Sequence, residues 1–526
     1  MYPNMPPPPV RRAGAREWLG LALLALPTVL LSMDITVLYL ALPHLDVDLG
    51  PSSTEVLWII DIYGFLIAGF LVTMGTLGDR IGRRRLLVIG AIGFTAASVV
   101  AAYATSPEML IAARALLGVF GATLMPSTLA LISNMFADSK QRAQAIAVWA
   151  ACFSSGFAIG PLVGGALLEI FWWGSVFLLA VPVMGLLVLA APFVLPEYKA
   201  PTTSRLDLVS VVLSLAGVVP IIWGIKELAD DGMHWPPAAA IVAGLVFGTW
   251  FVMRQRRLAE PLFDIRLFSD RAFSTAVAAL LIGVGVVGGV YLFITQFLQM
   301  VKGLEPFEAG LWMLPPAVAL MITAGAAPTL IRWIRPGFLV AGGMLVSSSG
   351  YVLLLQLDPE DSVLLLTAAL GVMFAGLGPV FALGTDIIVG AAPPARSGSA
   401  AAMSETAMEF GISLGIAVLG SVGAAVYRAE MDETMPAGVP SEAAEAAGET
   451  LPGAMAVAHG SPPEVGGTLT DSAFAAFTEG LHTTSIVCGI TVGAFALLSF
   501  VLLRNVRTQA QRDAAAAQQP GYTHVG

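Results

Sequence analysis

Apolar stretches long enough to cross a lipid bilayer recur along almost the whole chain, and they limit its fold more than any other feature. Runs of 18 or more apolar residues with few charges indicate membrane-spanning helices, which need about 20 residues. Only 12% of the 526 residues are charged, about half the usual share in a soluble protein. We therefore predict an all-α integral membrane protein with 14 transmembrane helices. The spans lie near residues 18–42, 56–76, 86–104, 108–132, 142–169, 172–195, 206–228, 237–254, 273–298, 307–330, 336–357, 361–390, 399–427 and 480–503.

Lys and Arg are distributed unevenly between the predicted loops. Cytoplasmic loops retain positive charge during membrane insertion. With the amino terminus inside and an even number of spans, all but four of the 26 Lys and Arg residues fall in cytoplasmic segments. Arg114 falls within a span, and Lys226, Lys302 and Arg428 fall near the outer face. This pattern predicts a multi-pass protein of the cytoplasmic membrane with both termini in the cytoplasm.

One long hydrophilic segment, residues 429–478, falls on the outer side. It contains acidic residues but no Lys or Arg, and it supplies most of the net charge of −10. Its Ala, Gly and Pro content favours a disordered or weakly helical loop. The alternative is an electrostatic collector of cations. We assign this segment no role in transport.

Residues that catalysis, metal binding or nucleotide binding would need are sparse. The two cysteines, Cys152 and Cys488, stand in separate apolar segments, and no Cys/His group has metal-ligand spacing. The phosphate-binding pattern Gly-x-x-x-x-Gly-Lys-[Ser/Thr] is missing from the sequence. A transporter driven by an ion gradient is therefore favoured over a membrane enzyme, an ATP-driven pump or a receptor.

The loop between the second and third spans combines glycines, an acid and several arginines. Glycine permits a tight turn, and a carboxylate can pair with arginines across two neighbouring helix ends. A plain cytoplasmic loop explains the charge, but the spacing of the three residue types is more specific. This conformational motif consists of Gly75, Asp79, Arg80, Gly82, Arg83 and Arg84.

One arginine, Arg114, lies inside the fourth span. A guanidinium in lipid is costly, so it must face an internal cavity or a carboxylate. Asp34 in the first span lies at a compatible depth. We predict that the two groups meet, either as a structural salt bridge or, as we favour, as a pair that takes part in proton exchange.

The fifth span carries small residues at four-residue intervals beside a proline. Small residues allow close helix packing in membranes, and proline bends a helix. The pattern is explained by packing alone, or by a hinge for alternating access. It consists of Gly156, Gly160, Pro161, Gly164 and Gly165.

Together with residues 33–43 of the first span, these three motifs resemble the major facilitator superfamily. Within it they resemble the fourteen-helix drug:H⁺ antiporter branch and its quaternary-ammonium multidrug efflux pumps. The resemblance implies a six-helix bundle over residues 1–198, an inserted helix pair over 199–258, and a second six-helix bundle over 259–526. It also implies a monomer that uses the proton gradient, without a cofactor, to export lipophilic and cationic drugs or antiseptics. The alternative is a dedicated exporter of an endogenous antibiotic, siderophore or other metabolite.

Buried acids and aromatic residues are the candidates for binding an organic cation, because carboxylates supply charge and aromatic faces attract cations. Glu405 and Glu409 are four residues apart and share one helical face. They repel each other when both are ionised, which favours proton uptake. Asp61 resembles an acidic position shared by these exporters. Proton coupling is predicted for Asp34, Asp61 and Arg114, and cation binding for Asp34, Asp61, Glu405 and Glu409. The aromatic candidates are Trp58, Tyr63, Phe153, Trp312, Phe381 and Phe410, with Tyr39, Tyr291 and Phe297 also within spans.

Overall fold

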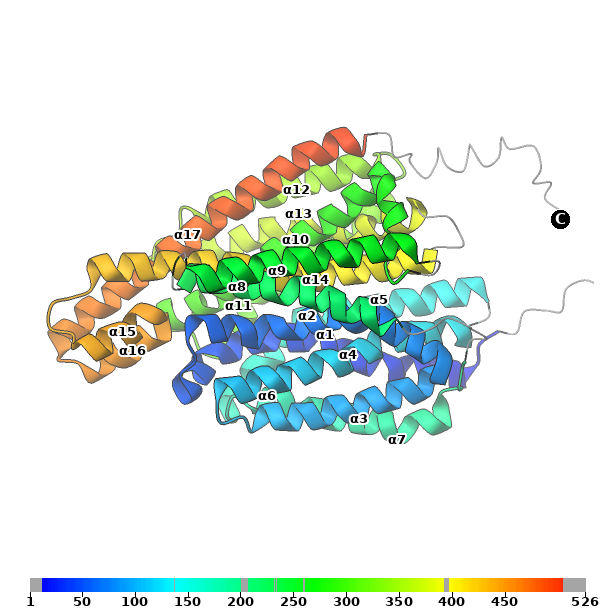
Figure 1. Cartoon of the computed structure of the whole chain (residues 1–526), viewed down its shortest axis with the longest axis horizontal. Coiled ribbons are helices and arrows are strands. Elements are labelled where there is room, and N and C mark those ends of the chain that lie inside the picture. Colours follow the sequence, from blue (N-terminus) through cyan, green and yellow to red (C-terminus); the bar gives the residue numbers. More distant parts are fainter. Residues whose placement is uncertain are drawn as a thin grey trace, which may run out of the picture.

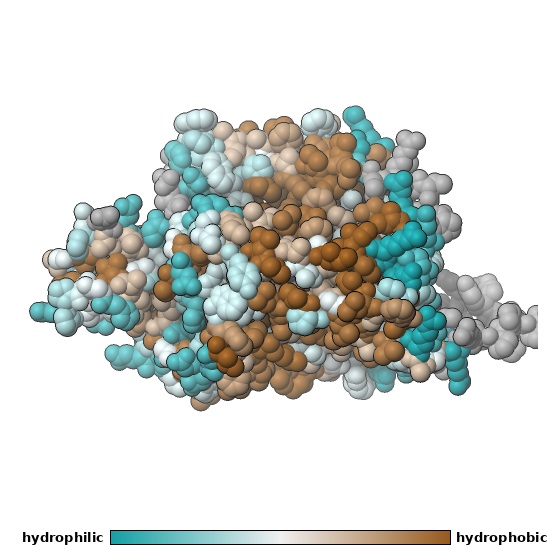
Figure 2. All heavy atoms as spheres, turned by 90° about the horizontal axis from the view of Figure 1, so that it is seen from below, coloured by the Kyte–Doolittle hydropathy of each residue, from teal (hydrophilic) through white to brown (hydrophobic). Residues whose placement is uncertain are grey.

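The computed structural model describes residues 12–136, 138–199, 207–230, 232, 234–258, 261–391 and 397–504. In this part of the chain, 14 helices are long and apolar enough to cross a membrane. The predicted all-α membrane architecture and number of spans are therefore confirmed. A broad apolar band runs around the middle of the visible face, with hydrophilic residues toward both ends (Figure 2), as expected of a protein surrounded by lipid.

The first six spans pack against one another. Their main contacts join α1 to α5, α2 to α4, and α3 to α4 and α7. Local signals set where these helices begin: the Ser52 hydroxyl accepts a hydrogen bond from the amide of Glu55, whose carboxylate accepts one from the Ser52 amide. The elements are α1 (Ala15–Leu49), α2 (Ser53–Ile81), α3 (Arg83–Ala102), α4 (Pro107–Met135), α5 (Ser139–Ile170), α6 (Ser175–Leu178) and α7 (Ala180–Val194).

The last six spans form a second group, in which α10 packs against α14, α11 and α12 against α13, and α12 against α17. The two groups meet where α2 contacts α14, α5 contacts α11 and α1 contacts α10. The elements are η1 (Ile265–Ser269), α10 (Arg271–Gln296), η2 (Phe297–Val301), α11 (Pro306–Leu330), α12 (Pro336–Leu354), α13 (Val363–Ala391), α14 (Ser397–Thr434) and α17 (Pro463–Leu502).

Two further spans, α8 (Leu208–Asp230) and α9 (Trp235–Arg257), lie between the two groups in sequence and form the inserted pair. They pack against each other, and α8 also contacts both α2 and α14. In Figure 1 the inserted pair therefore lies along the line where the two groups of spans meet.

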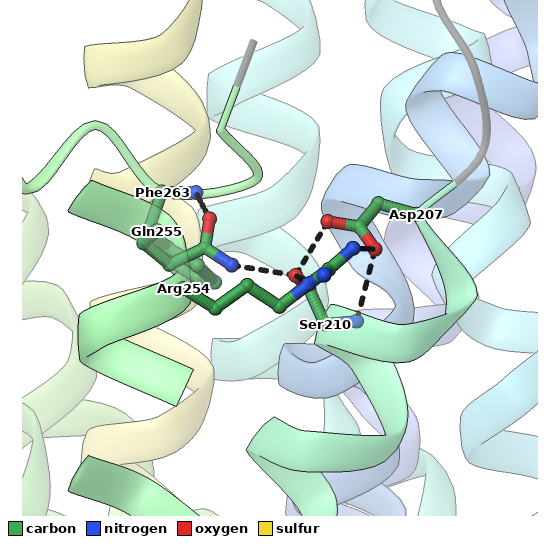
Figure 3. A network of polar contacts seen from close by, with 5 residues as sticks. All are labelled: Asp207, Ser210, Arg254, Gln255 and Phe263. Atoms are coloured by element: carbon green, nitrogen blue, oxygen red, sulfur yellow. Dashed lines mark hydrogen bonds and ion pairs between the residues drawn. The ribbon is translucent and has the colours of Figure 1, made fainter. Parts of the chain in front are cut away.

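Polar contacts join the two inserted helices where α8 begins and α9 ends (Figure 3). Arg254 donates a hydrogen bond to Asp207 at 2.8 Å, and Gln255 donates one to the Ser210 hydroxyl at 2.6 Å. Burial disfavours the ionised form of Asp207, but hydrogen bonds from Ser210 and Arg254 outweigh this effect and lower the pKa of its carboxyl. This network fixes the two helices to each other.

The hydrophilic segment 429–478 is folded, which corrects the expectation of a disordered or weakly helical loop. Helix α14 extends to Thr434 and α17 begins at Pro463, so both helices run well beyond the predicted spans. Between them lie α15 (Ser441–Glu449) and α16 (Leu451–Gly460). The Tyr427 hydroxyl donates a hydrogen bond to the carbonyl of Ala447. Alanine, which the composition argument took as a sign of disorder, is a good helix former, and so is glutamate.

The molecule has two distinct ends along its long axis (Figure 1). Helix α1 begins and α17 ends at one of them, called the terminal end below. Helices α15 and α16 project from the other, called the α15–α16 end.

Candidate functional site

A cavity of about 150 Å³, called the central cavity, lies between the two groups of spans. Six of the predicted candidates for cation binding line it: Glu405, Glu409, Phe153, Phe381, Tyr39 and Tyr291. Its wall is otherwise mostly apolar. The remaining lining residues are Ile35, Phe157, Val284, Val287, Gly288, Leu320, Phe374, Leu377, Met408 and Ile412. Phe157, Phe374 and Met408 were not among the predicted residues, because a helix that is apolar on every side does not reveal which face lines a cavity.

The two glutamates occupy successive turns of α14, as their spacing predicted. Glu409 is only 5% exposed. Neither carboxylate forms a hydrogen bond or ion pair with any residue in the described part of the chain. Glu409 also lines a smaller neighbouring cavity together with Tyr63 and Arg114. It therefore connects the central cavity with the buried arginine.

Arg114 and Asp34 form the predicted ion pair. The Arg114 Nη1 lies 2.6 Å from the Asp34 Oδ2, and the arginine is 1% exposed. Its guanidinium also donates hydrogen bonds to the carbonyls of Ile59 and Ile60, and it lies 4.4 Å from the centre of the Tyr63 ring. The buried charge is thus compensated by one carboxylate, two carbonyl dipoles and an aromatic face.

Asp34 does not line the central cavity. It faces a separate small cavity bordered by Phe94 and Phe177. The prediction that Asp34 binds the transported cation therefore lacks the expected geometry, since its carboxylate lies on a different side of α1. Its contact with Arg114 links it indirectly to the region around Glu409.

Asp61 has an unexpected partner. The Nζ of Lys226 on α8 lies 2.8 Å from the Asp61 Oδ2, and both side chains are 0% exposed. Lys226 lies near the end of α8, toward the end of the molecule that was predicted to face outward, but its side chain is fully buried, which was not expected. This contact was not predictable from the sequence, because Lys226 lies near the end of its apolar run and is followed by Glu227.

The other predicted aromatic residues lie outside the central cavity. Trp58 and Phe410 pack around Phe65, Ile222 and Ala417 in a small apolar cluster, called the junction cluster, where α2, α8 and α14 meet. Tyr63 faces Arg114. Trp312 is half-buried on α11, and its carbonyl accepts a hydrogen bond from Thr367. Phe297 is fully buried in η2.

Tyr39 and Tyr291 close the central cavity toward the α15–α16 end. Their rings meet edge to face with centroids 5.1 Å apart. Beyond them, residues of the same helices line a second cavity of about 70 Å³, called the rim cavity, over which Leu451 and Pro452 of α16 lie.

The predicted motif between the second and third spans joins three helices. Arg83 pairs with Asp79 at 2.7 Å across the turn between α2 and α3, as expected. Arg84 donates hydrogen bonds to the carbonyls of Pro192 and Leu195 at the end of α7. Gly82 has φ +113°, which L side chains rarely adopt.

The other members of this motif differ from expectation. Gly75 lies within α2, where an added Cβ would make only ordinary contact, so no tight turn requires glycine there. Arg80 is exposed, and within the described chain its side chain has no ion-pair partner.

The glycines of the fifth span serve two different contacts. Gly156, Gly160 and Gly164 lie against α1, where a Cβ on Gly164 would lie 2.7 Å from the Val37 Cγ1. Gly165 instead lies against α11, where its Cβ would be 2.6 Å from the Phe307 Cα. Only Gly165 and Pro161, which approaches Gly310, lie at the contact between the two groups of spans.

These features define a multi-pass membrane transporter: two groups of spans enclose a central cavity with acidic and aromatic walls, and within the described residues no three potential metal ligands come together. The chain matches the family model of the Major Facilitator Superfamily over residues 24–416 and belongs to that family.

Its relatives are drug efflux and resistance proteins. It is 44% identical to the multidrug efflux pump LfrA of Mycolicibacterium smegmatis, over 94% of this chain and 98% of that protein. It is 33% identical to the methyl viologen resistance protein SmvA of Salmonella typhimurium, over 88% and 93% of the two chains. It is 29% identical to the tetracenomycin C resistance and export protein of Streptomyces glaucescens, over 90% and 89%.

The fold also matches solved transporter structures. A bacterial homolog of the human lysosomal transporter Spinster, in an inward-facing and unoccupied conformation, superimposes with a TM-score of 0.64 at 16% identity. The match covers 94% of this chain and 99% of that chain. At this identity the likeness shows the fold alone.

Proposed function

We propose that this protein is a multidrug efflux pump that exchanges protons for lipophilic cations. The central cavity carries the proposal, because Glu405 and Glu409 stand there without a cationic partner in the described part of the chain, among apolar and aromatic side chains. Such a wall accepts the apolar body of a drug, while carboxylates and aromatic faces attract its charge. The names of LfrA and SmvA, which refer to multidrug efflux and methyl viologen resistance, support this substrate class.

Competition between protons and the cation couples the two fluxes. A protonated Glu409 cannot pair with a cation, and a bound cation disfavours its protonation. We assign cation binding to Glu405 and Glu409, and proton coupling to Asp34 with Arg114. A proton on Asp34 weakens its pair with Arg114, and the released guanidinium then competes with the transported cation for the carboxylate of nearby Glu409.

The proton gradient suffices to drive this exchange. Each net charge that moves inward through 100 mV releases about 2.3 kcal/mol, which supports roughly a fifty-fold concentration gradient per net charge moved, and the pH difference adds to this. The pump therefore needs no cofactor. We also propose that it acts as a monomer in the cytoplasmic membrane with the terminal end in the cytoplasm, since the arginines of the α2–α3 loop and of α9 lie on the cytoplasmic side in that orientation.

A dedicated exporter of one endogenous metabolite is the second candidate. The similarity to the tetracenomycin C export protein supports it. The two candidates differ in substrate range, which transport assays with unrelated cations separate.

Ethidium transport by reconstituted protein under an imposed pH gradient tests the proposal. We expect wild-type protein to move ethidium, a protonophore to stop the movement, and Asp34→Asn to abolish the response to the gradient. Asp48→Asn is the matched control, because Asp48 lies on the same helix but accepts a hydrogen bond from Trp173 at 2.9 Å. Absence of ethidium transport by the wild type would favour the dedicated exporter. A fully coupled Asp34→Asn variant would remove Asp34 from the mechanism.

A further inference from the structure

The inserted pair reaches the rest of the molecule through two unlike surfaces of α8. Toward α14 the contact is mostly apolar: Val218 and Ile222 of α8 belong to the junction cluster with Phe410, Leu414 and Ala417, and Arg428 of α14 donates one hydrogen bond to the Ala229 carbonyl at the end of α8. Toward α2 the contact includes the ion pair of Lys226 with Asp61. Apolar contacts are non-directional, whereas the attraction between two buried charges falls off as they move apart.

Lys226 lies between a carboxylate and an aromatic face. Its ammonium lies 2.8 Å from the Asp61 carboxylate and 3.8 Å from the centre of the Trp58 ring. A carboxylate beside the face of a tryptophan is the arrangement expected around an organic cation. In this structure the cation is supplied by the protein itself.

Lys226 and Asp61 form their ion pair with each other alone in the described residues. Both side chains are fully buried. Removal of one member of such a pair leaves an uncompensated buried charge and is strongly destabilising, whereas removal of both members is often neutral.

We propose that Lys226 is the resident cation of Asp61 and that this pair positions the inserted helices on the amino-terminal group of spans. Asp61 then neither binds the transported cation nor carries a proton during the exchange cycle. The statement that Asp61 takes no part in the exchange cycle rests on the proposed function. The statement that the pair positions the inserted helices does not. The assignment replaces the prediction from sequence that Asp61 serves proton coupling and substrate binding.

The proposal separates two kinds of carboxylate in the membrane. Asp61 is compensated by an internal cation and lies outside the central cavity, whereas Glu405 and Glu409 line the cavity without such a partner in the described residues. Asp34 also pairs with an internal cation, but it borders a cavity and is 13% exposed, whereas Asp61 is fully enclosed. Among these four acids, only Glu405 and Glu409 are open to the transported cation. The inserted pair therefore removes one buried acid from the exchange cycle.

A double-mutant cycle on the full-length protein tests the proposal. The variants are Lys226→Met, Asp61→Asn and the combination of both, with Lys226→Arg as the conservative replacement. The measurements are the Tm of the purified protein, the KM for ethidium, and the number of protons released when ethidium binds. The matched control is Asp207→Asn, which breaks the partly exposed pair between the two inserted helices.

We expect Lys226→Met and Asp61→Asn each to lower the Tm and the yield of folded protein far more than Asp207→Asn does. The double variant should regain the wild-type Tm, the wild-type KM and the wild-type proton release. Lys226→Arg should have a Tm close to that of the wild type. A double variant with normal Tm but fewer released protons or a raised KM would make Asp61 a coupling residue and overturn the proposal.

Two stability results would also overturn it: single variants as stable as the wild type, or a double variant as unstable as the singles. Failure of the proposed function is distinguishable from these outcomes. If the proposed function is wrong, wild-type protein shows no exchange of ethidium for protons. The Tm values of the single and double variants still decide whether the pair positions the inserted helices.

Discussion

At the scale of single residues, Glu409 is the group on which cation binding should depend most, because it lines both the central cavity and the cavity beside Arg114. Glu409→Gln keeps the shape of the side chain and removes its charge. An interaction with a charged group contributes about 1.5–3 kcal/mol. We therefore expect ethidium to bind roughly ten- to a hundredfold more weakly, as measured by fluorescence titration of purified protein.

The control for this variant is Glu433→Gln, which lies on the same helix but is exposed. It should bind ethidium with wild-type affinity. Unchanged affinity in Glu409→Gln would show that the cation does not pair with this carboxylate.

The positions of site residues were predicted correctly from the sequence where helical periodicity, or the free-energy cost of a charge in lipid, determines the position. Glu405 and Glu409 share one face because they are four residues apart, and Arg114 required an internal partner. Periodicity could not orient Trp58 or Phe410, because their helices are apolar on several sides. It also could not pair Lys226 with Asp61, because that contact depends on how α8 docks against α2.

At the scale of helices, the contact between α5 and α11 depends on a residue without a side chain. A Cβ at position 165 would lie 2.6 Å from the Phe307 Cα, and backbone atoms cannot give way as a flexible side chain can. Gly165→Ala should therefore push α5 and α11 apart and lower the Tm of the purified protein. Gly185→Ala is the control, since nothing lies within 4 Å of its added Cβ. Equal Tm values for the two variants would show that the contact between α5 and α11 does not require glycine at position 165.

A second contact between helices lies near the rim cavity. Arg428 of α14 donates hydrogen bonds to the Ser53 hydroxyl of α2, at 2.8 Å, and to the carbonyl of Ala229 on α8. It thus joins both groups of spans and the inserted pair. Arg428→Gln should weaken closure at the α15–α16 end and increase, several-fold, the rate at which a maleimide reacts with a cysteine placed at Leu57, a lining residue of the rim cavity.

The control for Arg428→Gln is Arg271→Gln, which removes an exposed charge where α10 begins. It should leave the labelling rate unchanged. A rate in Arg428→Gln equal to that of the wild type would mean that these hydrogen bonds do not hold the helices together.

Helix number was predictable from the sequence, but helix length was not. Apolar runs report only the part of a helix that lies in lipid, so α14 and α17 were predicted to be shorter than they are. The polar turns that extend these helices, and α15 and α16 between them, are stabilised by contacts such as the hydrogen bond from Tyr427 to Ala447. Composition does not reveal such contacts.

At the scale of the whole molecule, charge gives the two ends different preferences for the sides of the membrane. The arginines of the α2–α3 loop and the last turn of α9 favour retention in the cytoplasm. Residues 429–478, which form α15, α16 and parts of α14 and α17, contain acidic residues but no Lys or Arg and so do not oppose export. Both signals favour the proposed orientation, with α15 and α16 outside.

This orientation predicts which introduced cysteines react with a membrane-impermeant maleimide in intact cells. In a background without Cys152 and Cys488, a cysteine at the exposed position Ser441 on α15 should react at once. A cysteine at the exposed position Arg332, between α11 and α12, should react only after the cells are permeabilised. Both sites lie outside the apolar runs, so a difference in labelling reports the side of the membrane. The reverse pattern would place the termini outside, and the central cavity would then have to load its cation from the opposite side to that proposed.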